Sequence, residues 1–414
     1  NSSIIKNARF GVSTAATDGE GNIIWSTTGG IIRAYNSTFQ NNYKDIQFLA
    51  YSFSNSSLFQ DVIFETSDAL IDGQSYPSDH ISMYEVNGVV FEGCTIRNTS
   101  LYDPSAPFEY RGNGIRSINA SYTVGDLCLN QMPPCTNAKK TSISDLNYGI
   151  LTYNYEPTNS ITIRESDFTN NRRSLYLGNA DYAMIISNSF QIPLSTNGDT
   201  CYGFYLGTST GYHVEGNEFS TSGNQLNTNP QFSYPPREIG LIVDNSGGLP
   251  NEIYRNRFDS LDVAILAQRV NRSSEGGSSE DGDGGGGVPV NPNTGLVLKC
   301  NTYNENSWDE MVARENPYGV EGIARDQGNP SPRSKEDLAG NTFSPFHESA
   351  QLSETDIKNA GNYIFYYHHI QQVGLNTPRA KPDFYTVSLV QPVQKSYYFD
   401  SLCCPSTLNS GGSQ

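Results

Sequence analysis

The feature that most constrains the fold of this chain is a short pattern that recurs along it: an asparagine, one variable residue and an aromatic residue. An aliphatic residue stands three positions before each of these asparagines, so apolar side chains flank the Asn on both sides. The asparagines are Asn188, Asn217, Asn256, Asn301 and Asn341. The aromatic residues that follow them are Phe190, Phe219, Phe258, Tyr303 and Phe343.

These two apolar columns predict a bend in the chain at or beside each asparagine. In a straight strand, positions five apart lie on opposite faces, yet both columns are apolar and should face one core. Asparagine tolerates the left-handed backbone conformation that such a bend requires. Its side-chain amide can also bond to the equivalent amide in the coils above and below, so we expect a ladder of asparagines at stacked corners.

The same spacing extends upstream with other small or apolar residues at the corner. These further corners are Ala8, Ser37, Val62, Cys94, Ser144 and Ser166. Glycine followed by an alternating apolar run, as in "YGILTY" (148–153), predicts strands that start after tight turns. Because parallel crossovers are right-handed, the sequence predicts an all-β, right-handed parallel β-helix of about eleven coils. A β-sandwich or propeller has a similar content of strands. The aliphatic, Asn and aromatic residues keep the same spacing in every repeat, however, which favours coils that stack in register.

The predicted β-helix covers residues 1–345, with long loops between its coils, among them 119–141 and 304–337. The run "RSSEGGSSEDGDGGGG" makes 272–287 a flexible acidic loop. Past residue 345 the repeat stops, and the aromatic segments of 346–414 predict an irregular C-terminal β segment. We expect it to cap the coil or link it onward, because a β-helix must cover the unpaired backbone groups at its ends.

Charge and hydropathy exclude two kinds of partner. The formal net charge of −17 and the pI of about 4.7 would repel a phosphate backbone, so nucleic acid is not expected to bind. No stretch approaches the ~18 consecutive apolar residues of a membrane span, so we expect no membrane insertion.

The seven cysteines predict at least one disulfide. "CLNQMPPC" places Cys128 and Cys135 across a short Pro-containing loop, which favours a local bridge. The adjacent residues Cys403 and Cys404 cannot easily pair with each other, so one of them is expected to pair elsewhere, for example with Cys300 or Cys201.

Segments such as "IIRAYNSTFQNNYKDIQF", "IYRNRFDSLDVAI" and "GLVLKCNTYNEN" resemble the secreted right-handed parallel β-helix proteins of Bacteroidota, in the pectate-lyase-like superfamily. The resemblance covers roughly residues 1–345. It implies an exported chain, secreted and associated with the cell surface, and part of a larger protein; the first residue, Asn1 rather than Met, agrees with a processed or excised piece. It does not indicate one chemistry, because the superfamily includes lyases, hydrolases and adhesins.

No catalytic motif stands out in the sequence. A lyase of acidic polysaccharides needs stacked carboxylates that hold Ca²⁺ and a basic residue with a lowered pKa. The solvent-facing position two before the corner carries no acidic ladder, and the best basic pair is Arg172 and Arg173. The sequence shows no metal motif, and Ca²⁺ is the only cofactor that it leaves open, through the "DGDGGGG" of residues 281–287.

The sequence leaves three functions open, the third of which is a filament-building subunit that joins its neighbours through coil ends or loops. The favoured interpretation is a non-catalytic structural or adhesive β-helix of a surface or secreted protein, which contacts polysaccharide or other surface or filament proteins and can form oligomers. The alternative is a carbohydrate-active enzyme, a polysaccharide lyase or glycoside hydrolase. The 26 Tyr and 19 Phe allow an aromatic face for sugars, for which the loops at 101–112 and 229–238 are candidates.

Overall fold

The computed structural model describes residues 2–15, 18, 20, 22–51, 53–70, 76–99, 107–130, 135–156, 159–195, 198–222, 236–273, 294–313, 321–344, 356–370, 380–382, 390–400 and 402–407. The chain divides into two compact units, Asn1–Tyr205 (unit 1) and Leu206–Gln414 (unit 2). The boundary falls inside strand β22 (Cys201–Gly207), and each unit is described by itself.

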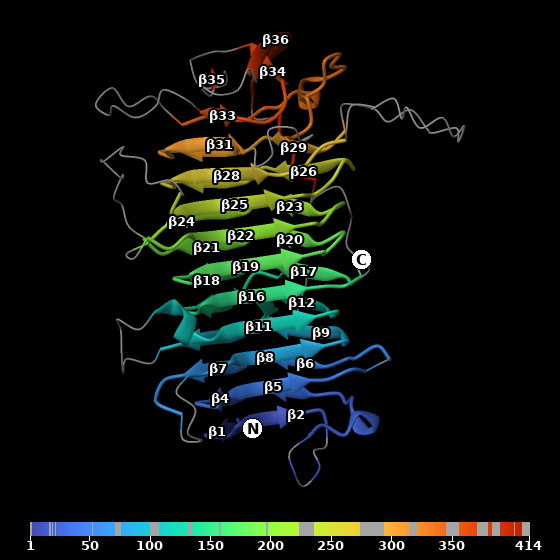
Figure 1. Ribbon diagram of the computed structural model, residues 1–414, viewed down its shortest axis with the longest axis vertical. Helices are drawn as coiled ribbons and strands as arrows, with labels where there is room; N and C mark the ends of the chain where they lie inside the picture. Colours follow the sequence, from blue (N-terminus) through green and yellow to red (C-terminus); the bar gives the residue numbers. More distant parts are fainter. Residues whose placement is uncertain are drawn as a thin grey trace. The chain divides into compact units, whose positions relative to one another are not determined.

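Unit 1 consists of three parallel sheets, whose strands follow one another in chain order (Figure 1). Sheet 1 contains β1 (Ile4–Lys6), β4 (Thr38–Gln40), β7 (Ile63–Thr66), β10 (Thr95–Asn98), β15 (Thr141–Ser144), β18 (Ser166–Thr169) and β21 (Ser189–Ile192). Sheet 2 contains β2 (Phe10–Ser13), β5 (Lys44–Phe48), β8 (Asp79–Tyr84), β11 (Asn113–Ile118), β16 (Tyr148–Tyr153), β19 (Arg173–Gly178) and β22. Sheet 3 contains β3 (Arg33–Tyr35), β6 (Leu58–Gln60), β9 (Asn87–Glu92), β12 (Ser121–Gly125), β17 (Ile161–Arg164) and β20 (Met184–Ile186).

Unit 2 has the same organisation. Sheet 4 contains β24 (Glu218–Thr221), β27 (Arg257–Asp259) and β30 (Thr302–Asn304). Sheet 5 contains β25 (Glu238–Asp244), β28 (Val263–Gln268), β31 (Trp308–Val312), β33 (Ile357–Asn359) and β35 (Ala380–Pro382). Sheet 6 contains β23 (His213–Glu215), β26 (Asn251–Tyr254) and β29 (Leu296–Lys299), and sheet 7 contains β32 (Asp326–Gln327), β34 (Ile364–Ile370) and β36 (Val390–Tyr398).

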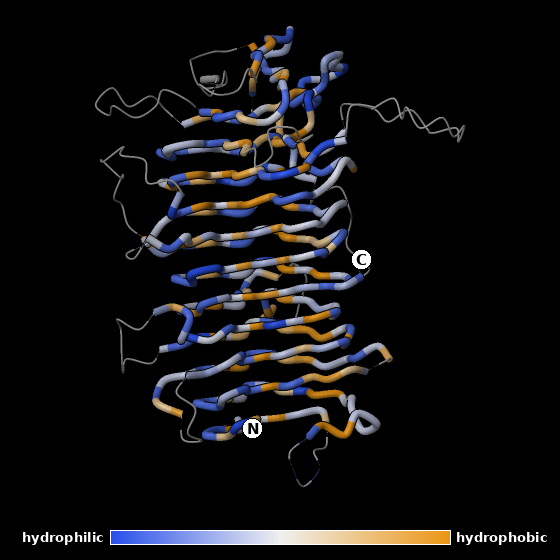
Figure 2. Tube along the Cα trace, in the orientation of Figure 1, coloured by the Kyte–Doolittle hydropathy of each residue, from blue (hydrophilic) through white to orange (hydrophobic). Residues whose placement is uncertain are grey.

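The order of strands along the chain identifies the fold. Apart from one short antiparallel pair in unit 1, consecutive strands belong to different sheets, and the strands pair in parallel with their counterparts on neighbouring coils. Such a chain turns through three sheets per coil, and parallel crossovers of this kind are right-handed. Each unit is therefore built from coils of a right-handed parallel β-helix, which confirms the predicted fold class. In each unit, hydrophobic residues recur along the strands from one coil to the next (Figure 2).

Rings of the aromatic column stack on one another in the core. In unit 1, the rings of Phe39 and Phe64 lie 5.2 Å apart and those of Phe168 and Phe190 lie 4.8 Å apart. In unit 2, Phe258 lies 4.8 Å from Phe219 and 5.5 Å from Tyr303, with interplanar angles of 6° and 22°. Aromatic stacking of this kind contributes about 0.5–1.5 kcal/mol per pair beyond the area that it buries.

Two predicted corners, Ala8 and Ser144, are wrong. Ile5 pairs with Phe39, and Ile143 pairs with Ile96, so both isoleucines belong to the aromatic column itself. The corner lies two residues before that column, at Ser3 and Thr141. The pattern of an aliphatic, a small and an apolar residue also fits a position further along the chain in these two coils. Only the pairing of strands between coils shows which of the two positions is the corner.

The asparagines at the corners are buried and hydrogen-bonded from coil to coil. The backbone N–H of Asn217 donates to Oδ1 of Asn256 (3.0 Å), and that of Asn256 donates to Oδ1 of Asn301 (3.0 Å). Asn301 donates in the same way to Oδ1 of Asn341 (2.8 Å). In unit 1, Oδ1 of Asn188 accepts from the N–H of Ser166 (3.1 Å). Each of these side chains therefore satisfies a backbone group that the bend removes from the sheet.

The left-handed residue at the corner is not the asparagine but the residue before it. These residues are Ser187 (φ 54°), Gly216 (φ 68°), Arg255 (φ 54°), Cys300 (φ 59°) and Gly340 (φ 66°). The varied identity of these residues shows that conformational tolerance does not select the Asn. Hydrogen bonding selects it instead.

Several predicted loops contain strands. Segment 119–141 holds β12 and the antiparallel pair β13 (Leu127–Cys128) and β14 (Ala138–Lys139), and segment 304–337 holds β31 and β32. Disulfides join Cys128 to Cys135 in unit 1 and Cys300 to Cys404 in unit 2. Of the acidic loop 272–287, residues 274–287 lie outside the described residues. No helix in the part of the chain that the structure describes has the length and apolar character that a membrane crossing requires.

Candidate functional site

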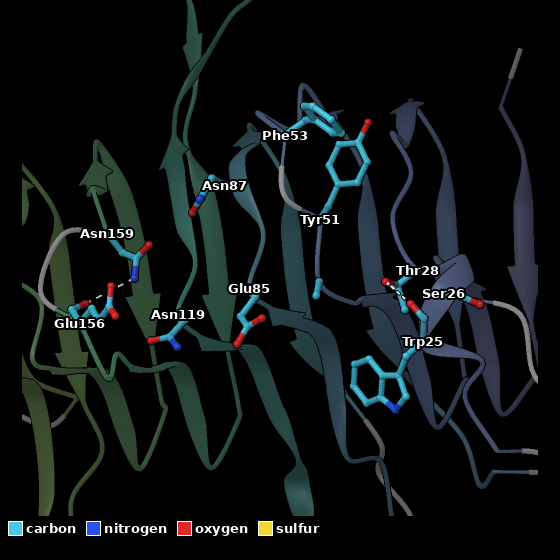
Figure 3. Close-up of a pocket in the computed structure, with 11 residues that line it drawn as sticks. Trp25, Ser26, Thr28, Tyr51, Phe53, Glu85, Asn87, Asn119, Glu156 and Asn159 are labelled. Atoms are coloured by element: carbon cyan, nitrogen blue, oxygen red, sulfur yellow. Dashed lines mark hydrogen bonds between the residues drawn. The ribbon is translucent and has the colours of Figure 1, made fainter.

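An open groove of about 640 Å³ lies at the C-terminal ends of the sheet 2 strands in unit 1. It is built from the connections that follow β2, β5, β8, β11 and β16 (Figure 3). The residues that line it are Trp25, Ser26, Thr28, Ala50, Tyr51, Phe53, Glu85, Asn87, Asn119, Glu156 and Asn159. In Figure 3 they form a row, with Trp25 at one end, Glu156 and Asn159 at the other, and Glu85 and Asn119 between them.

Backbone hydrogen bonds fix the spacing of this row. The N–H of Tyr51 donates to the carbonyl of Glu85 (3.0 Å), and the N–H of Glu85 donates to the carbonyl of Ile118 (3.0 Å). The N–H of Asn119 donates to the carbonyl of Tyr153 (3.2 Å). Successive side chains are therefore one coil apart, about 4.8 Å, and the groove extends over about 20 Å. Glu85 and Asn119 have φ values of 51° and 49°, which turn the chain sharply after each strand.

Exposed aromatic rings stand along the groove. Trp25, in the short 3-10 helix η1 (Trp25–Thr27), is 59% exposed, and its ring meets the edge of Tyr84 at 6.2 Å. Phe53 is 72% exposed and packs against Tyr51 at 5.9 Å. Large aromatic groups left in water at a concave surface form an apolar platform for a flat ligand face, such as that of a sugar ring.

Polar groups lie beside these rings. Oδ1 of Asn119 accepts from the N–H of Tyr155 (2.6 Å), and Nδ2 of Asn159 donates to the carbonyl of Glu156 (3.4 Å), so these amides are held in place. The carboxyl group of Glu85 hydrogen-bonds to Tyr84 and raises the pKa of its phenol. Glu85 and Glu156 are both exposed. Fixed amides and carboxylates beside aromatic rings suit the alternating hydroxyl and apolar surfaces of a saccharide.

The charge of the groove narrows the class of ligand. None of the 11 residues that line it, all of them described, is Lys or Arg, whereas two are Glu. The chain as a whole carries a formal charge of −17. A polyanionic ligand would therefore meet repulsion along the groove, and an uncharged one would not.

The predicted basic pair lies outside the groove lining. Nη1 of Arg172 forms an ion pair with Glu109 (2.5 Å), and its Nη2 lies 3.4 Å from Asp199. Arg173 donates to the hydroxyl of Tyr148, and its guanidinium lies 5.0 Å from that ring. Burial lowers the pKa of Arg173, but the neighbouring phenols of Tyr202 and Tyr148 outweigh it, and the net shift is upward. A general base needs the opposite shift.

Other predicted site features are placed as follows. Of the aromatic loops, residues 101–106 and 229–235 lie outside the described residues, while Tyr110 stacks on Tyr76 at 4.2 Å. The "DGDGGGG" run, 281–287, also lies outside them. Among the residues that the structure describes, no group of three or more His, Cys, Asp or Glu side chains is placed to hold a metal ion.

Sequence reasoning missed the groove because it searched the strand face two positions before each Asn corner. The groove lies instead at the far end of the sheet 2 strands. Its one signal in the sequence is a polar or acidic residue directly after an alternating run, as Glu85 follows "HISMY" and Asn119 follows "GIRSI".

Comparison with known proteins adds little to this geometry. No family model matches the sequence, and no curated protein matches it. Among solved structures, the chain is similar to the crystal structure of endo-xylogalacturonan hydrolase from Aspergillus tubingensis. The sequence identity is 11% and the TM-score 0.18, over 90% of this chain and 82% of that chain. A TM-score this low carries no argument, so the function is proposed from the site alone.

Proposed function

We propose that unit 1 binds a neutral extracellular polysaccharide along the groove at the C-terminal ends of the sheet 2 strands. The observation that carries this proposal is the row of exposed aromatic rings, amides and carboxylates, one coil apart, with no cationic side chain in the lining. Rings at the Trp25 end stack on sugar faces, and Glu85, Asn87 and Asn119 accept or donate hydrogen bonds to hydroxyl groups. The groove length of about 20 Å suits an extended chain rather than a single sugar.

Hydrolysis of the bound chain is a second candidate function. The observation in its favour is that Glu85 and Glu156 are the two carboxylates of the lining. They follow strands two coils apart, about 10 Å along the stacking direction, close to the separation of about 6.5–9.5 Å between the two carboxyl groups of inverting glycosidases. In that role one carboxyl protonates the leaving oxygen and the other activates water.

Binding is tested by affinity electrophoresis in gels that contain either a neutral polysaccharide, such as arabinoxylan or galactan, or polygalacturonate. Retardation by a neutral polymer and not by polygalacturonate is expected. Trp25→Ala should weaken the binding about tenfold, because one stacked aromatic contributes on the order of 1–2 kcal/mol. Tyr182→Ala is the matched control, because Tyr182 is 69% exposed in the same unit but does not line the groove.

Equal losses in the two variants, or retardation by polygalacturonate alone, would contradict the proposal. The hydrolytic candidate has its own readout, the release of reducing ends from the retained polymer. Glu85→Gln and Glu156→Gln should each abolish that release. Retardation should persist in both variants, because glutamine can still hydrogen-bond to hydroxyl groups. If the wild-type protein retards the polymer without releasing reducing ends, unit 1 binds but does not hydrolyse.

A further inference from the structure

The outer face of sheet 6 in unit 2 carries a charged side chain that is completely buried. Along β23, Val214 points into the core, so His213 and Glu215 point outward, where a β-helix strand normally meets water. Glu215 is nevertheless 0% exposed, whereas His213 is 38% exposed. A buried carboxylate is stable only when other groups replace its water, so something must cover it.

The cover is the segment Leu402–Thr407. Its Ser406 hydroxyl donates to Oε1 of Glu215 (3.0 Å), and the backbone N–H of Thr407 donates to the same oxygen (3.1 Å). The Thr407 hydroxyl donates to Oε2 of Glu215, and Nε2 of His213 lies 2.9 Å from that oxygen. The segment thus presents two neighbouring hydroxyl groups to one carboxylate.

The charges of this site favour hydrogen-bond donors. Burial raises the pKa of Glu215, but the hydrogen bonds from Thr407 and Ser406 outweigh it, and the net shift is downward. Nη1 of Arg255 lies 3.5 Å from Oε1 of Glu215, so the carboxylate is paired as well as hydrogen-bonded. Glu252, the register partner of His213 on the next strand, is half-exposed and lies 3.9 Å from Nζ of Lys299. Glu215, rather than Glu252, is therefore the carboxylate that the segment covers.

The cover is tethered to the sheet that it hides. The disulfide from Cys300 to Cys404 joins it to the residue that follows β29, across a sequence separation of 104. The hydroxyl of Tyr254 donates to the carbonyl of Pro405 (2.6 Å). The hydrogen bonds of the segment can each be replaced by a bond to water or to another hydroxyl group. The disulfide is a covalent tie, and only a reductant removes it.

We infer that Leu402–Thr407 is a strap that occupies a hydroxyl-binding site formed by His213 and Glu215, and that reduction of the Cys300–Cys404 disulfide releases it. A dithiol reductant supplies two electrons and two protons, Cys300 and Cys404 become thiols, and the reductant becomes a disulfide. The hydroxyls of Ser406 and Thr407 stand where two adjacent hydroxyls of a neutral sugar would bind. This site belongs to unit 2 and does not depend on the function proposed for unit 1.

Carboxyl footprinting of the full chain with a carbodiimide and glycine ethyl ester, read by mass spectrometry, tests the strap. Glu215 should resist labelling in the oxidised protein and label about tenfold faster after treatment with dithiothreitol or in Cys300→Ser, a change equivalent to about 1.4 kcal/mol of opening. Glu310, 1% exposed in the core of unit 2, should stay unlabelled throughout and reports that the unit remains folded. Cys128→Ser, which removes the other disulfide, is the matched control and should leave Glu215 protected.

Labelling of Glu215 in the oxidised protein would show that the segment does not cover it and would overturn the strap. If the labelling rate of Glu215 stays the same after reduction while Glu310 remains protected, the disulfide does not hold the strap in place. The ligand class is tested in the reduced protein with cellohexaose as the neutral probe and a sulfated carrageenan hexasaccharide, which has no carboxyl group to consume the carbodiimide, as the acidic one. Cellohexaose should slow the labelling of Glu215 about threefold or more, and the sulfated hexasaccharide should not. Faster labelling that neither probe slows would overturn the hydroxyl-binding assignment.

Discussion

Replacing Glu310 with glutamine should remove much of the pH dependence of the stability of unit 2. Glu310 is 1% exposed on β31, where its Oε1 accepts from the hydroxyl of Tyr303 (2.9 Å) and from Nδ2 of Asn341 (3.2 Å). Burial is the main cause that raises its pKa to about 8; the Tyr303 hydrogen bond opposes this shift, and the nearby carboxyls of Asp309 and Asp356 add to it. Burial likewise raises the pKa of Asp309 to about 7.

The sign and size of the effect follow from proton linkage. A carboxyl whose folded pKa lies above its unfolded value of about 4.3 stabilises the folded state most below that value and loses the stabilisation as the pH rises through the folded pKa. Between about pH 5 and pH 8, one retained proton costs about 1.4 kcal/mol per pH unit, or about 4 kcal/mol in total. Glutamine can accept the same hydrogen bonds through Oε1 and does not ionise, so this part of the slope should disappear.

Urea unfolding of the wild-type chain and of Glu310→Gln, followed at several values between about pH 5 and pH 8, measures this difference. The wild type should lose several kcal/mol of unfolding free energy over the range, while the variant loses less and becomes the more stable protein near pH 8. Glu305→Gln, at a partly exposed site of the same unit, should keep the wild-type slope. Equal slopes for the wild type and Glu310→Gln would refute the reasoning.

Three further changes test the structural account of the coils. Phe258→Ala opens the middle of an aromatic stack and should lower the unfolding free energy of unit 2 in urea by about 3–5 kcal/mol. The control Tyr182→Ala, at an exposed site of unit 1, should lower that of unit 1 by at most about 0.5 kcal/mol. Asn256→Ala removes the side-chain hydrogen bonds to the N–H of Asn217 and to the carbonyl of Val214 and should cost about 2–3 kcal/mol; a cost below about 0.5 kcal/mol would contradict the ladder. Cys300→Ser removes a link that spans 104 residues and should destabilise more than Cys128→Ser, whose link spans 7, by about 2 kcal/mol on the chain-entropy account; the reverse order of melting temperatures would contradict it.

The sequence was sufficient to predict the fold class because the core repeats. A column such as Phe219, Phe258 and Tyr303 has one simple explanation, in-register stacking of coils, and the pairing of β24, β27 and β30 has that register. The asparagines at these corners do not themselves adopt the left-handed conformation. The left-handed residue is Arg255 rather than Asn256, because the side chain of the Asn is used for hydrogen bonds and the turn is made one residue earlier.

The sites could not be predicted in the same way. The groove residues Trp25, Glu85 and Glu156 lie in connections of different length, so no fixed spacing joins them, and only the stacking of coils brings them together. The burial of Glu215 depends on Ser406 and Thr407, which are 191 and 192 positions away along the chain. Nothing around "YHVEGN" distinguishes a covered carboxylate from an exposed one.

The central claim, that the groove of unit 1 binds a neutral polysaccharide, is tested most directly through its own tryptophan. The chain has two Trp residues, Trp25, which is 59% exposed, and Trp308, which is 4% exposed. In Trp308→Phe the emission therefore reports Trp25 alone, and acrylamide quenching measures its access to solvent. Soluble neutral oligosaccharides cut from the retained polymer should lower the quenching constant in a saturable way, and oligogalacturonate should not. Quenching of Trp25 that stays the same at every concentration of neutral oligosaccharide would contradict the account.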